Sequence, residues 1–511
     1  MNKRGFTLVE LIGTIVILLV LSLLVFPNLL NLIKNSKKDI STSTKDFIYG
    51  QAKSYIYDNV NSYTLKEGNI YCIGLKDLVS KNYLNTPLKD AESGNDIDLS
   101  KQIEVKVNNN DYSYELVETC TPKSYYTDNS GANTPKLFNN MVPIKYEYEK
   151  WIVANTSEKW YDYDAKEWAN AVVLNGGVTK NVGDEITEDE VVQWYVWIPR
   201  YKYTIFNGNN GSAKEQLIDV TFESGTNRTG TVTCSDNADG SETCTDNVYG
   251  NVTNGKSTYT HPAFKFGNTE LTGFWVGKFE VSGSYEQDGY TLINIKPNVP
   301  SLRGKTVSQF FESIQYTNMQ MMTGADGHMM KNMEWGAVAY LKQSKYGLGT
   351  TDIAINDNSR FYTGGGQSDA YKTNVAQSTT GNIYGVYDMS GGAWEYVMGN
   401  MNNSSNAFYS SNAGFTTAPD AKYYDSYKYG TSYTSHARGK LGDATKETLT
   451  TFGNTSGGWY GDSASFPYSS SSWFHRGGFC FSGTGAGVFY FYGSSGGVSD
   501  YISARAVLSD Q

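Results

Sequence analysis

The side chains with the widest chemical repertoire in this sequence are its five cysteines. In an oxidising compartment, pairing between neighbours along the chain predicts the disulfides Cys72–Cys120 and Cys234–Cys244, with free buried thiols as the alternative for the first pair. Cys480 is then alone, and one thiol cannot supply the two thiolates that Cu(I) prefers. Because no cysteine pair has CxxC spacing, we predict no structural zinc or other metal site. The four histidines are scattered along the chain: His261, His328, His436 and His475.

Motifs for hydrolysis or phosphate binding are missing from the sequence, which has no GxSxG, HExxH or P-loop. The segment DNADG (236–240) resembles part of a calcium loop, but it lacks the ligand spacing and the terminal glutamate of such a loop. We interpret it as the tip of a hairpin closed by Cys234 and Cys244. No cofactor is predicted, and calcium binding is neither indicated nor excluded.

The composition of residues 479–502 indicates a binding surface. This segment contains no Lys, Glu, Gln, Met or Trp. Glycine and apolar positions typical of a scaffold alternate with Phe, Tyr, Cys, Ser, Gly, Val and Asp, each of which arises from an asparagine codon when only its adenines change. Aromatic, Ser and Gly side chains suit a binding surface because they give contact area at low entropic cost. The predicted ligand-binding residues are Phe474, His475, Phe479, Cys480, Phe481, Gly485, Tyr490, Tyr492, Ser494, Ser495, Val498, Ser499, Asp500 and Tyr501.

Four stretches in the second half of the chain carry a family resemblance. They are WVGKFEVS (275–282), the predicted helix around Glu334 and Trp335, GVYDMSGGAWEYV (385–397), and the closing RGG and ARAVL segments. Together they resemble the formylglycine-generating-enzyme domain on a C-type-lectin-like scaffold. We expect Trp394 to be a core anchor. The predicted scaffold residues are Trp394, Glu395, Trp473, Arg476, Gly477, Gly478 and Arg505.

The closing segment also resembles the variable region of target proteins of diversity-generating retroelements, which use the C-type-lectin fold. That resemblance implies diversified side chains that project onto one ligand-binding face. Enzymes of the formylglycine-generating family bind copper through a cysteine pair after RGG, whereas this chain has only Cys480 there. We therefore predict no enzymatic activity. The alternatives are an ordinary Gly/Tyr/Ser-rich loop region and a membrane-tethered oxidase of the formylglycine-generating type.

The N-terminus determines the predicted location of the chain. Residues 11–33 carry no charge and would span about 34 Å as a helix, enough for a hydrocarbon core of about 30 Å. With Lys3 and Arg4 in front, this region resembles a type IV prepilin leader that is cut by a prepilin peptidase and then methylated. The resemblance implies cleavage between Gly5 and Phe6 and fibre-assembly roles for Glu10 and Pro27, beside other pilin subunits. An uncleaved membrane anchor is the alternative.

Composition and patterning predict an α+β chain with several parts. The leader is 1–5 and a long pilin helix covers 6–60, with the membrane span at 11–33. A small β head covers 61–125, with a helix at 75–84 and strands at 103–107 and 112–117. A linker and a small aromatic β unit cover 126–189, and a C-type-lectin-like domain covers 190–511, with a strand pair in 191–206 and a helix at 332–347. Trp151, Trp160 and Trp168 are expected in a β core, with a carbohydrate-stacking stripe as the alternative.

These features predict a minor or tip pilin-like adhesin at the cell membrane and then on the cell surface or pilus, with residues after about 34 outside the cytoplasm. A net charge of −10 argues against nucleic acid as a partner. The expected ligand is an external protein or glycan. A structural pseudopilin of a secretion or DNA-uptake system is a further alternative.

Overall fold

The computed structural model describes residues 40–59, 63, 65, 68–108, 111–207, 214–366, 370–434, 438–450 and 457–510. The chain forms two compact units, Met1–Leu65 with Asn69–Ser124, and Tyr125–Gln511 with Lys66–Gly68. Within the described ranges, no helix combines the length and apolar character that a membrane crossing needs. The predicted leader, membrane span and assembly residues lie outside the described residues, namely Gly5, Phe6, Glu10 and Pro27.

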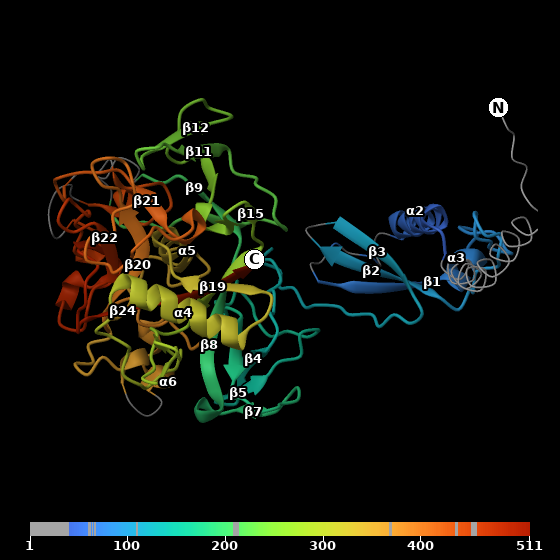
Figure 1. Cartoon of the computed structure of the whole chain (residues 1–511), viewed down its shortest axis with the longest axis horizontal. Helices are drawn as coiled ribbons and strands as arrows, with labels where there is room; N and C mark the ends of the chain where they lie inside the picture. The colour runs from blue at the N-terminus through green and yellow to red at the C-terminus, as the bar shows by residue number, and fades with distance from the viewer. Residues whose placement is uncertain are drawn as a thin grey trace, which may run out of the picture. The chain divides into compact units, whose positions relative to one another are not determined.

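The first unit is a helix packed on a three-stranded antiparallel sheet of order β1-β2-β3 (Figure 1). Ile48, Ala52 and Ile56 recur at helical spacing and are buried, together with Ile103 and Val105, which alternate along β2. The disulfide Cys72–Cys120 closes this unit. The predicted strands and this disulfide are confirmed, and the predicted helix at 75–84 is shorter. The elements are α2 (Thr42–Asp58), β1 (Ile70–Gly74), α3 (Leu75–Ser80), β2 (Gln102–Asn108) and β3 (Asp111–Val117).

The second unit contains an eight-stranded sheet of order β19-β25-β16-β8-β6-β4-β5-β7. Its strands come from both ends of the unit, because the C-terminal strand lies between β19 and β16. The strands are β4 (Met141–Glu147), β5 (Lys150–Val153), β6 (Asn170–Leu174), β7 (Glu185–Ile186), β8 (Val191–Pro199), β16 (Gly273–Gly277), β19 (Ala325–Met329) and β25 (Ala506–Asp510).

The predicted boundary at residue 190 is wrong. β6 pairs with β8 across that position, with Asn170 opposite Val196 and Leu174 opposite Val191, so residues 126–189 are part of the large sheet and not a separate β unit. The tryptophans of this stretch lie in the core, as expected, and do not form an exposed stripe for stacking carbohydrate. They are 3 % exposed or less: Trp151, Trp160 and Trp168.

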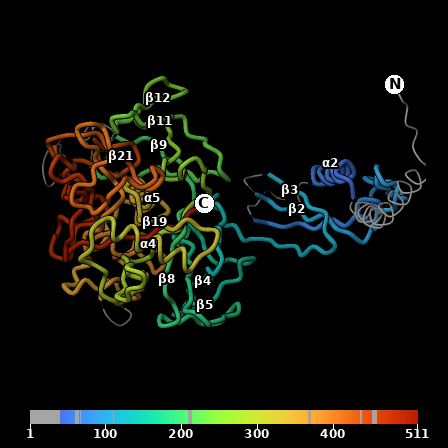
Figure 2. Tube along the Cα trace, in the orientation of Figure 1, coloured from blue at the N-terminus to red at the C-terminus, as the bar shows by residue number. Residues whose placement is uncertain are grey.

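A second, five-stranded sheet occupies the opposite side of this unit from β4, β5 and β7 in the view of Figure 1. Its order is β21-β20-β22-β23, with β24 also paired to β20 in parallel. The Cα trace in Figure 2 shows the long irregular connections between its strands. The strands are β20 (Trp394–Met401), β21 (Asp425–Tyr427), β22 (Trp473–Gly477), β23 (Gly487–Ser494) and β24 (Ile502–Ala504).

The remaining elements surround the two sheets. The predicted strand pair in 191–206 is corrected, since β8 lies in the large sheet whereas β9 pairs with β10 and β13. The predicted helix at 332–347 is present but ends at Lys342. The elements are β9 (Tyr201–Thr204), β10 (Val220–Phe222), β11 (Val232–Asp236), β12 (Glu242–Asp246), β13 (Thr258–Thr260), β14 (Lys265–Phe266), β15 (Thr269–Glu270), β17 (Glu286–Gln287), β18 (Tyr290–Thr291), α4 (Val307–Met321), α5 (Asn332–Lys342) and α6 (Ala370–Thr373).

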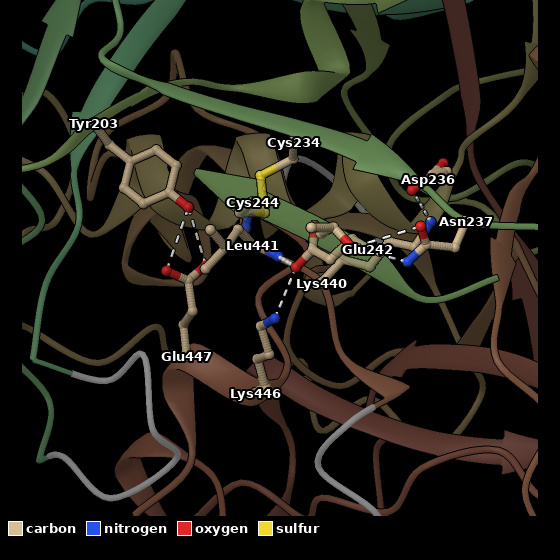
Figure 3. Close-up of a disulfide and its surroundings, with 12 residues drawn as sticks. Tyr203, Cys234, Asp236, Asn237, Glu242, Cys244, Lys440, Leu441, Lys446 and Glu447 are labelled. Carbon is tan, nitrogen blue, oxygen red and sulfur yellow. Dashed lines mark hydrogen bonds and ion pairs between the residues drawn. A yellow bond between two sulfur atoms is a disulfide. The ribbon is translucent and has the colours of Figure 1, made fainter. Parts of the chain in front are cut away.

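The hairpin β11–β12 carries the second predicted disulfide. Cys234 and Cys244 are register partners in this hairpin and are joined covalently (Figure 3). The turn between the strands contains the DNADG segment, so the interpretation of 236–240 as a disulfide-closed hairpin tip is confirmed.

Candidate functional site

The two sides of strands β22 and β23 have different environments. His475 is opposite Tyr492 and Arg476 is opposite Phe491, so residues at these paired positions point to the same side of the sheet. Phe491 is fully buried against Phe466 and Phe474. Tyr492, one residue further on, keeps partial exposure on the other side. The alternation therefore separates a core side from a surface side.

On the surface side, aromatic rings contact one another without interruption. Trp394 of β20 lies 5.2 Å from His475 and 4.2 Å from Phe479 between ring centroids. Tyr490 and Tyr492 stack on each other at 6.4 Å, and His475 lies 5.6 Å from Tyr490. Phe479 continues the contacts outward, at 5.8 Å from Phe481 and 6.0 Å from Tyr501. We call this set the aromatic face: Trp394, His475, Phe479, Phe481, Tyr490, Tyr492 and Tyr501.

The aromatic face contains a pocket of about 570 Å³. Its lining combines rings of the face with the small polar residues Ser463 and Ser482. Phe481 and Tyr501, which belong to the face but do not line the pocket, are 64 % and 50 % exposed. A concave, mostly apolar site with a few polar groups is the usual form of a ligand site.

The aromatic face is almost free of charge at neutral pH. Burial, with a smaller contribution from the neighbouring Arg476, lowers the pKa of His475 to about 3, so its ring is neutral. Burial also raises the pKa of the Tyr490 hydroxyl. These groups can therefore stack and form hydrogen bonds, but they do not exchange protons near pH 7.

Beneath the face, a buried ion pair fixes β20 to the C-terminal strands. Arg505 donates from Nε to Glu395 Oε2 at 2.9 Å and from Nη2 to Glu395 Oε1 at 2.5 Å. The same guanidinium donates to the carbonyl oxygens of Gly277 and Tyr387 at 2.8 and 2.9 Å. Both charged side chains have no exposed surface. Because its hydrogen bonds are satisfied, this pair can be buried without a large penalty.

A second buried arginine holds β22. Arg476 Nη2 donates to the Ala444 carbonyl at 2.9 Å and Nη1 to Asn332 Oδ1 at 3.2 Å. The segment that supplies this carbonyl is in turn tied to the disulfide hairpin. Figure 3 shows Glu242 of β12 accepting from Lys446 Nζ and from the Leu441 amide, both at 2.7 Å. The hairpin, this loop and β22 are thus joined by a continuous set of polar contacts.

The turn that precedes β20 is fixed by buried carboxyl groups. Glu280 accepts from the Ala393 amide at 2.8 Å, and Asp388 accepts from the Gly364 amide at 2.8 Å and from Asn356 Nδ2 at 2.9 Å. Burial, reinforced by the negative charge of Asp388, raises the pKa of Glu280 well above its usual range. The main chain leading to Trp394 is held by these hydrogen bonds.

Glycine is required at the end of β22. Gly478 has φ of +72°, and a Cβ there would lie 2.5 Å from Cα of Ala486. Gly477 also has a positive φ of +84° but leaves more space. These two residues let the chain turn from the buried strand to Phe479 on the surface. Trp473 at the start of β22 is fully buried and stacks on Phe415 at 5.7 Å.

Three of the predicted site residues lie elsewhere than expected. Phe474 is fully buried and contacts Tyr427 at 4.8 Å, because it is one residue before His475 and so lies on the core side. Cys480 is 5 % exposed and packs with Phe361 under Phe479. Trp394 is not a core anchor, since its ring is only partly buried and belongs to the aromatic face.

The other predicted ligand-binding residues follow the end of β23 or the turn before it. Ser494 lines the pocket, and its hydroxyl lies 3.0 Å from that of Tyr396. Val498 is 65 % exposed. Tyr396 is not among the predicted residues, although it is two residues from Trp394 and period-two alternation would have placed both on the same side as His475. The remaining members are half-buried or exposed: Gly485, Ser495, Ser499 and Asp500.

The environment of the cysteines does not favour a reactive thiol or a metal site here. Burial raises the pKa of the Cys480 thiol, and the other four cysteines form the two disulfides. In the part of the chain that the structure describes, one group of side chains has the spacing of a metal site, Cys234, Glu242 and Cys244. Its two sulfurs are bonded to each other, so they are not thiolate ligands.

Comparisons with known proteins bear mainly on the N-terminus. Residues 1–26 match the family model described as the prokaryotic N-terminal methylation motif. The chain carries a prepilin-type N-terminus. The predicted resemblance to a prepilin leader is thereby confirmed, and this match implies processing by a prepilin peptidase and assembly with other pilins.

Matches over the rest of the chain are distant. No curated protein matches it. Among solved structures, the Major Tropism Determinant I1 variant is 13 % identical, with 80 % of this chain and 81 % of that chain covered and a TM-score of 0.27. The U1 variant is 12 % identical, with coverages of 81 % and 82 % and a TM-score of 0.26. Such TM-scores are too low to equate the folds, so the C-type-lectin-like architecture stays a prediction.

Proposed function

We propose that this chain is a surface-displayed pilin-like adhesin that binds an external protein or glycan through the aromatic face. The observation that carries the proposal is a set of rings on strands whose other side is fixed by Arg505 and Arg476, extended by the exposed rings of Phe481 and Tyr501 in the loops on either side of β23. Exposed aromatic clusters on a rigid support are typical of binding surfaces.

Binding without chemistry accounts for this arrangement better than oxidation of a substrate thiol. The thiol of Cys480 lies beneath Phe479, and its pKa is raised, so little of the nucleophilic thiolate forms near pH 7. We infer that the variability implied by the composition of 479–502 is confined to the surface side of the strands. A near-copy of the codons for 473–509, with adenines at the varied positions and a reverse transcriptase gene beside it, would support diversification.

The N-terminus supplies the means of display. In this proposal Phe6 becomes the first residue of the mature chain, Glu10 and Pro27 act in fibre assembly, and the chain after about residue 34 is outside the cytoplasm. A C-terminal unit of this size would crowd a fibre shaft, which favours a minor or tip position. Edman sequencing of the mature protein should begin at methylated Phe6. Equal abundance with a major pilin in sheared fibres would contradict the minor or tip position.

Adhesion by cells that display the full chain tests the binding face. The double variant Phe481→Ser/Tyr492→Ser should lose binding to an array of immobilised glycans and surface proteins that the wild type binds. Tyr148 is 94 % exposed and lies outside the face, so Tyr148→Ser is the matched control and should bind like the wild type. Identical binding by the wild type and the double variant would contradict the proposal.

A further inference from the structure

A second pocket, of about 630 Å³, lies beside the aromatic face. It is formed by residues 282–285 and 299–303 together with Asn294, Lys296 and Asp500, the last from the loop after β23. The segment 299–303 is tied to that loop, because Arg303 Nη1 donates to the Asp500 carbonyl and the Gly304 amide donates to the Ser499 carbonyl at 2.9 Å. The pocket is therefore built mainly from residues outside 479–502, the segment whose composition indicates a binding surface.

The pocket is continuous with the aromatic face through Arg303. Its guanidinium lies over the ring of Phe361, 4.1 Å from the centroid, and Phe361 contacts Tyr501 at 6.2 Å. Arg303 Nε is buried and has no hydrogen-bond partner among the described residues. A guanidinium that is positioned by one carbonyl and one ring keeps donors available for an anion.

Lys296 adds a second cation to the pocket. Within the described part of the chain, no carboxylate lies within ion-pair distance of its ammonium group. Burial lowers its pKa, an effect that Asp189 and Glu188 oppose from further away. Asp500 is the only carboxylate among the described residues that line the pocket, so the lining carries an excess of positive charge in a chain of net charge −10.

Another pocket, of about 830 Å³, differs in how its cations are held. Lys440 pairs with Asp236 at 2.6 Å, Lys422 with Asp326 at 2.8 Å and Arg228 with Glu270 at 2.8 Å. The pocket beside the aromatic face differs in that neither of its two cations, Lys296 and Arg303, has an ion-pair partner among the described residues.

Neutral hydrogen-bonding groups complete the pocket. Ser301 is 5 % exposed, and its hydroxyl has no partner among the described residues. Ser282 is also buried, and its hydroxyl donates to the Asn294 carbonyl at 3.3 Å. At the rim, Tyr285 is 68 % exposed and offers a ring for stacking. Two cations alone would suffice for an acidic peptide side chain, whereas hydroxyl groups and an aromatic rim also suit the hydroxyls and flat faces of a sugar.

We propose that this pocket binds an acidic sugar, with its carboxylate or sulfate group at Lys296 and Arg303 and its hydroxyls at Ser301 and Asn294. The inference rests on the proposed adhesin function and deepens it, because it assigns a constant subsite for an acidic glycan next to the face that is free to vary. The aromatic face would then select among ligands that share this acidic group.

The test uses the full-length protein in a polyoxyethylene detergent, which has no sugar headgroup. Three probes are titrated calorimetrically: trigalacturonate, a sulfated disaccharide and triglutamate. We expect at least one acidic sugar to bind, its uncharged counterpart (methyl ester or desulfated) to bind at least tenfold more weakly, and affinity to fall between 50 and 300 mM salt because the contact is electrostatic. Absence of binding by both acidic sugars, or equal binding of triglutamate, would overturn the proposal.

Variants locate the site. Lys296→Met and Ser301→Ala should each lower the affinity for the acidic sugar at least threefold. Lys256→Met changes an exposed lysine outside the pocket and should leave this affinity unchanged. Unfolding followed by tryptophan fluorescence checks that each variant is folded. Equal loss in the Lys256 variant, or no loss in the Lys296 and Ser301 variants, would refute the assignment.

The two proposals fail in different ways. Tyr492→Ser should abolish adhesion of displaying cells but leave the affinity for the acidic sugar unchanged. If that variant loses adhesion and Lys296→Met changes neither readout, the subsite is wrong and the adhesin function stands. If Phe481→Ser/Tyr492→Ser leaves adhesion intact, the adhesin function itself is wrong.

Discussion

The aromatic face and the layer directly beneath it are built from the same strands but are held by different forces. On the face, Tyr490 and Tyr492 contact other rings. Beneath it, Glu395 and Arg505 are joined by two charge-assisted hydrogen bonds and have no exposed surface. Ring contacts tolerate replacement because they have little directionality, whereas buried polar contacts fail when one partner is removed. Tolerance to substitution should therefore alternate residue by residue along these strands.

The strongest test of this contrast is Arg505→Met. Removal of the guanidinium leaves Glu395 buried without its partner, which typically costs about 3–5 kcal/mol of the free energy of unfolding. Urea unfolding of the full chain, followed by tryptophan fluorescence, measures the loss. All ten tryptophans lie in residues 125–511, so the signal reports this unit alone.

An exposed arginine provides the control for that experiment. Arg228 pairs with Glu270 at 2.8 Å, but its side chain is 43 % exposed. Arg228→Met should cost less than about 1 kcal/mol, because solvent screens exposed pairs. Similar losses for Arg228→Met and Arg505→Met would mean that the buried pair does not support the strands as described.

Gly478→Ala should give the next largest effect. The new Cβ would meet Cα of Ala486 at 2.5 Å and would require a non-glycine residue at a φ of +72°. Strain and overpacking together predict a loss of about 2–4 kcal/mol. Gly483 also has a positive φ, +54°, but has open space around it, so Gly483→Ala isolates the backbone contribution and should cost about 1 kcal/mol. Equal costs would show that the close approach to Ala486 is relaxed by a small shift.

Much of this contrast could be predicted from sequence alone. The ligand-binding residues predicted from the closing segment include Tyr490 and Tyr492, which alternate along β23 with the fully buried Phe489 and Phe491. Tyr492 is half-buried, whereas Tyr490 is only 5 % exposed. The disulfides followed from pairing of neighbouring cysteines in a chain that is predicted to lie outside the cytoplasm. Local patterns of this kind need no knowledge of how distant segments meet.

The failures involved contacts between segments that are distant in sequence. Trp394 was expected in the core, because the local sequence does not show to which side of the sheet this side chain points. Its orientation depends on the pairing of β20 with β22, about 80 residues later in the chain. The boundary at 190 failed because β6 pairs with β8 across it. The acidic-sugar pocket was not predicted at all, since it joins Arg303 to Asp500 across 197 residues.

Two histidines, His475 on the aromatic face and His328 in β19 of the large sheet, predict opposite responses to pH. Burial alone would lower the pKa of His328, but Glu334, 3.0 Å away, and Asp326 outweigh it and raise the pKa. The stabilisation from His328 is therefore complete below about pH 6.5, the pKa in the unfolded chain, and is lost as pH rises through the folded value. For His475, with a pKa lowered to about 3, stability is lost as pH falls from about 6.5 towards 3.

The measurement is the difference in unfolding free energy between the wild type and each variant as a function of pH. The cost of His328→Gln should shrink as pH rises above 6.5. The cost of His475→Gln should be constant above pH 6.5 and shrink below it, because the wild type itself becomes less stable there. Parallel curves for the two variants would contradict the different environments assigned to these rings.

The smallest expected effect on stability falls on the face itself. Phe481 is 64 % exposed and Tyr492 is partly exposed, and their rings contact Phe479 and Tyr490 of the face. Phe481→Ser should therefore change the free energy of unfolding by no more than about 0.5 kcal/mol, as is usual for surface positions. Tyr492→Ser should cost about 1 kcal/mol or less because one stacking contact is lost. Phe489→Ser, three residues away on the core side, should cost more than about 3 kcal/mol, since that ring is fully buried against Trp459. If Phe481→Ser and Tyr492→Ser destabilised the unit as much as Phe489→Ser does, these two rings would be part of the core. Their positions could then not vary without loss of stability.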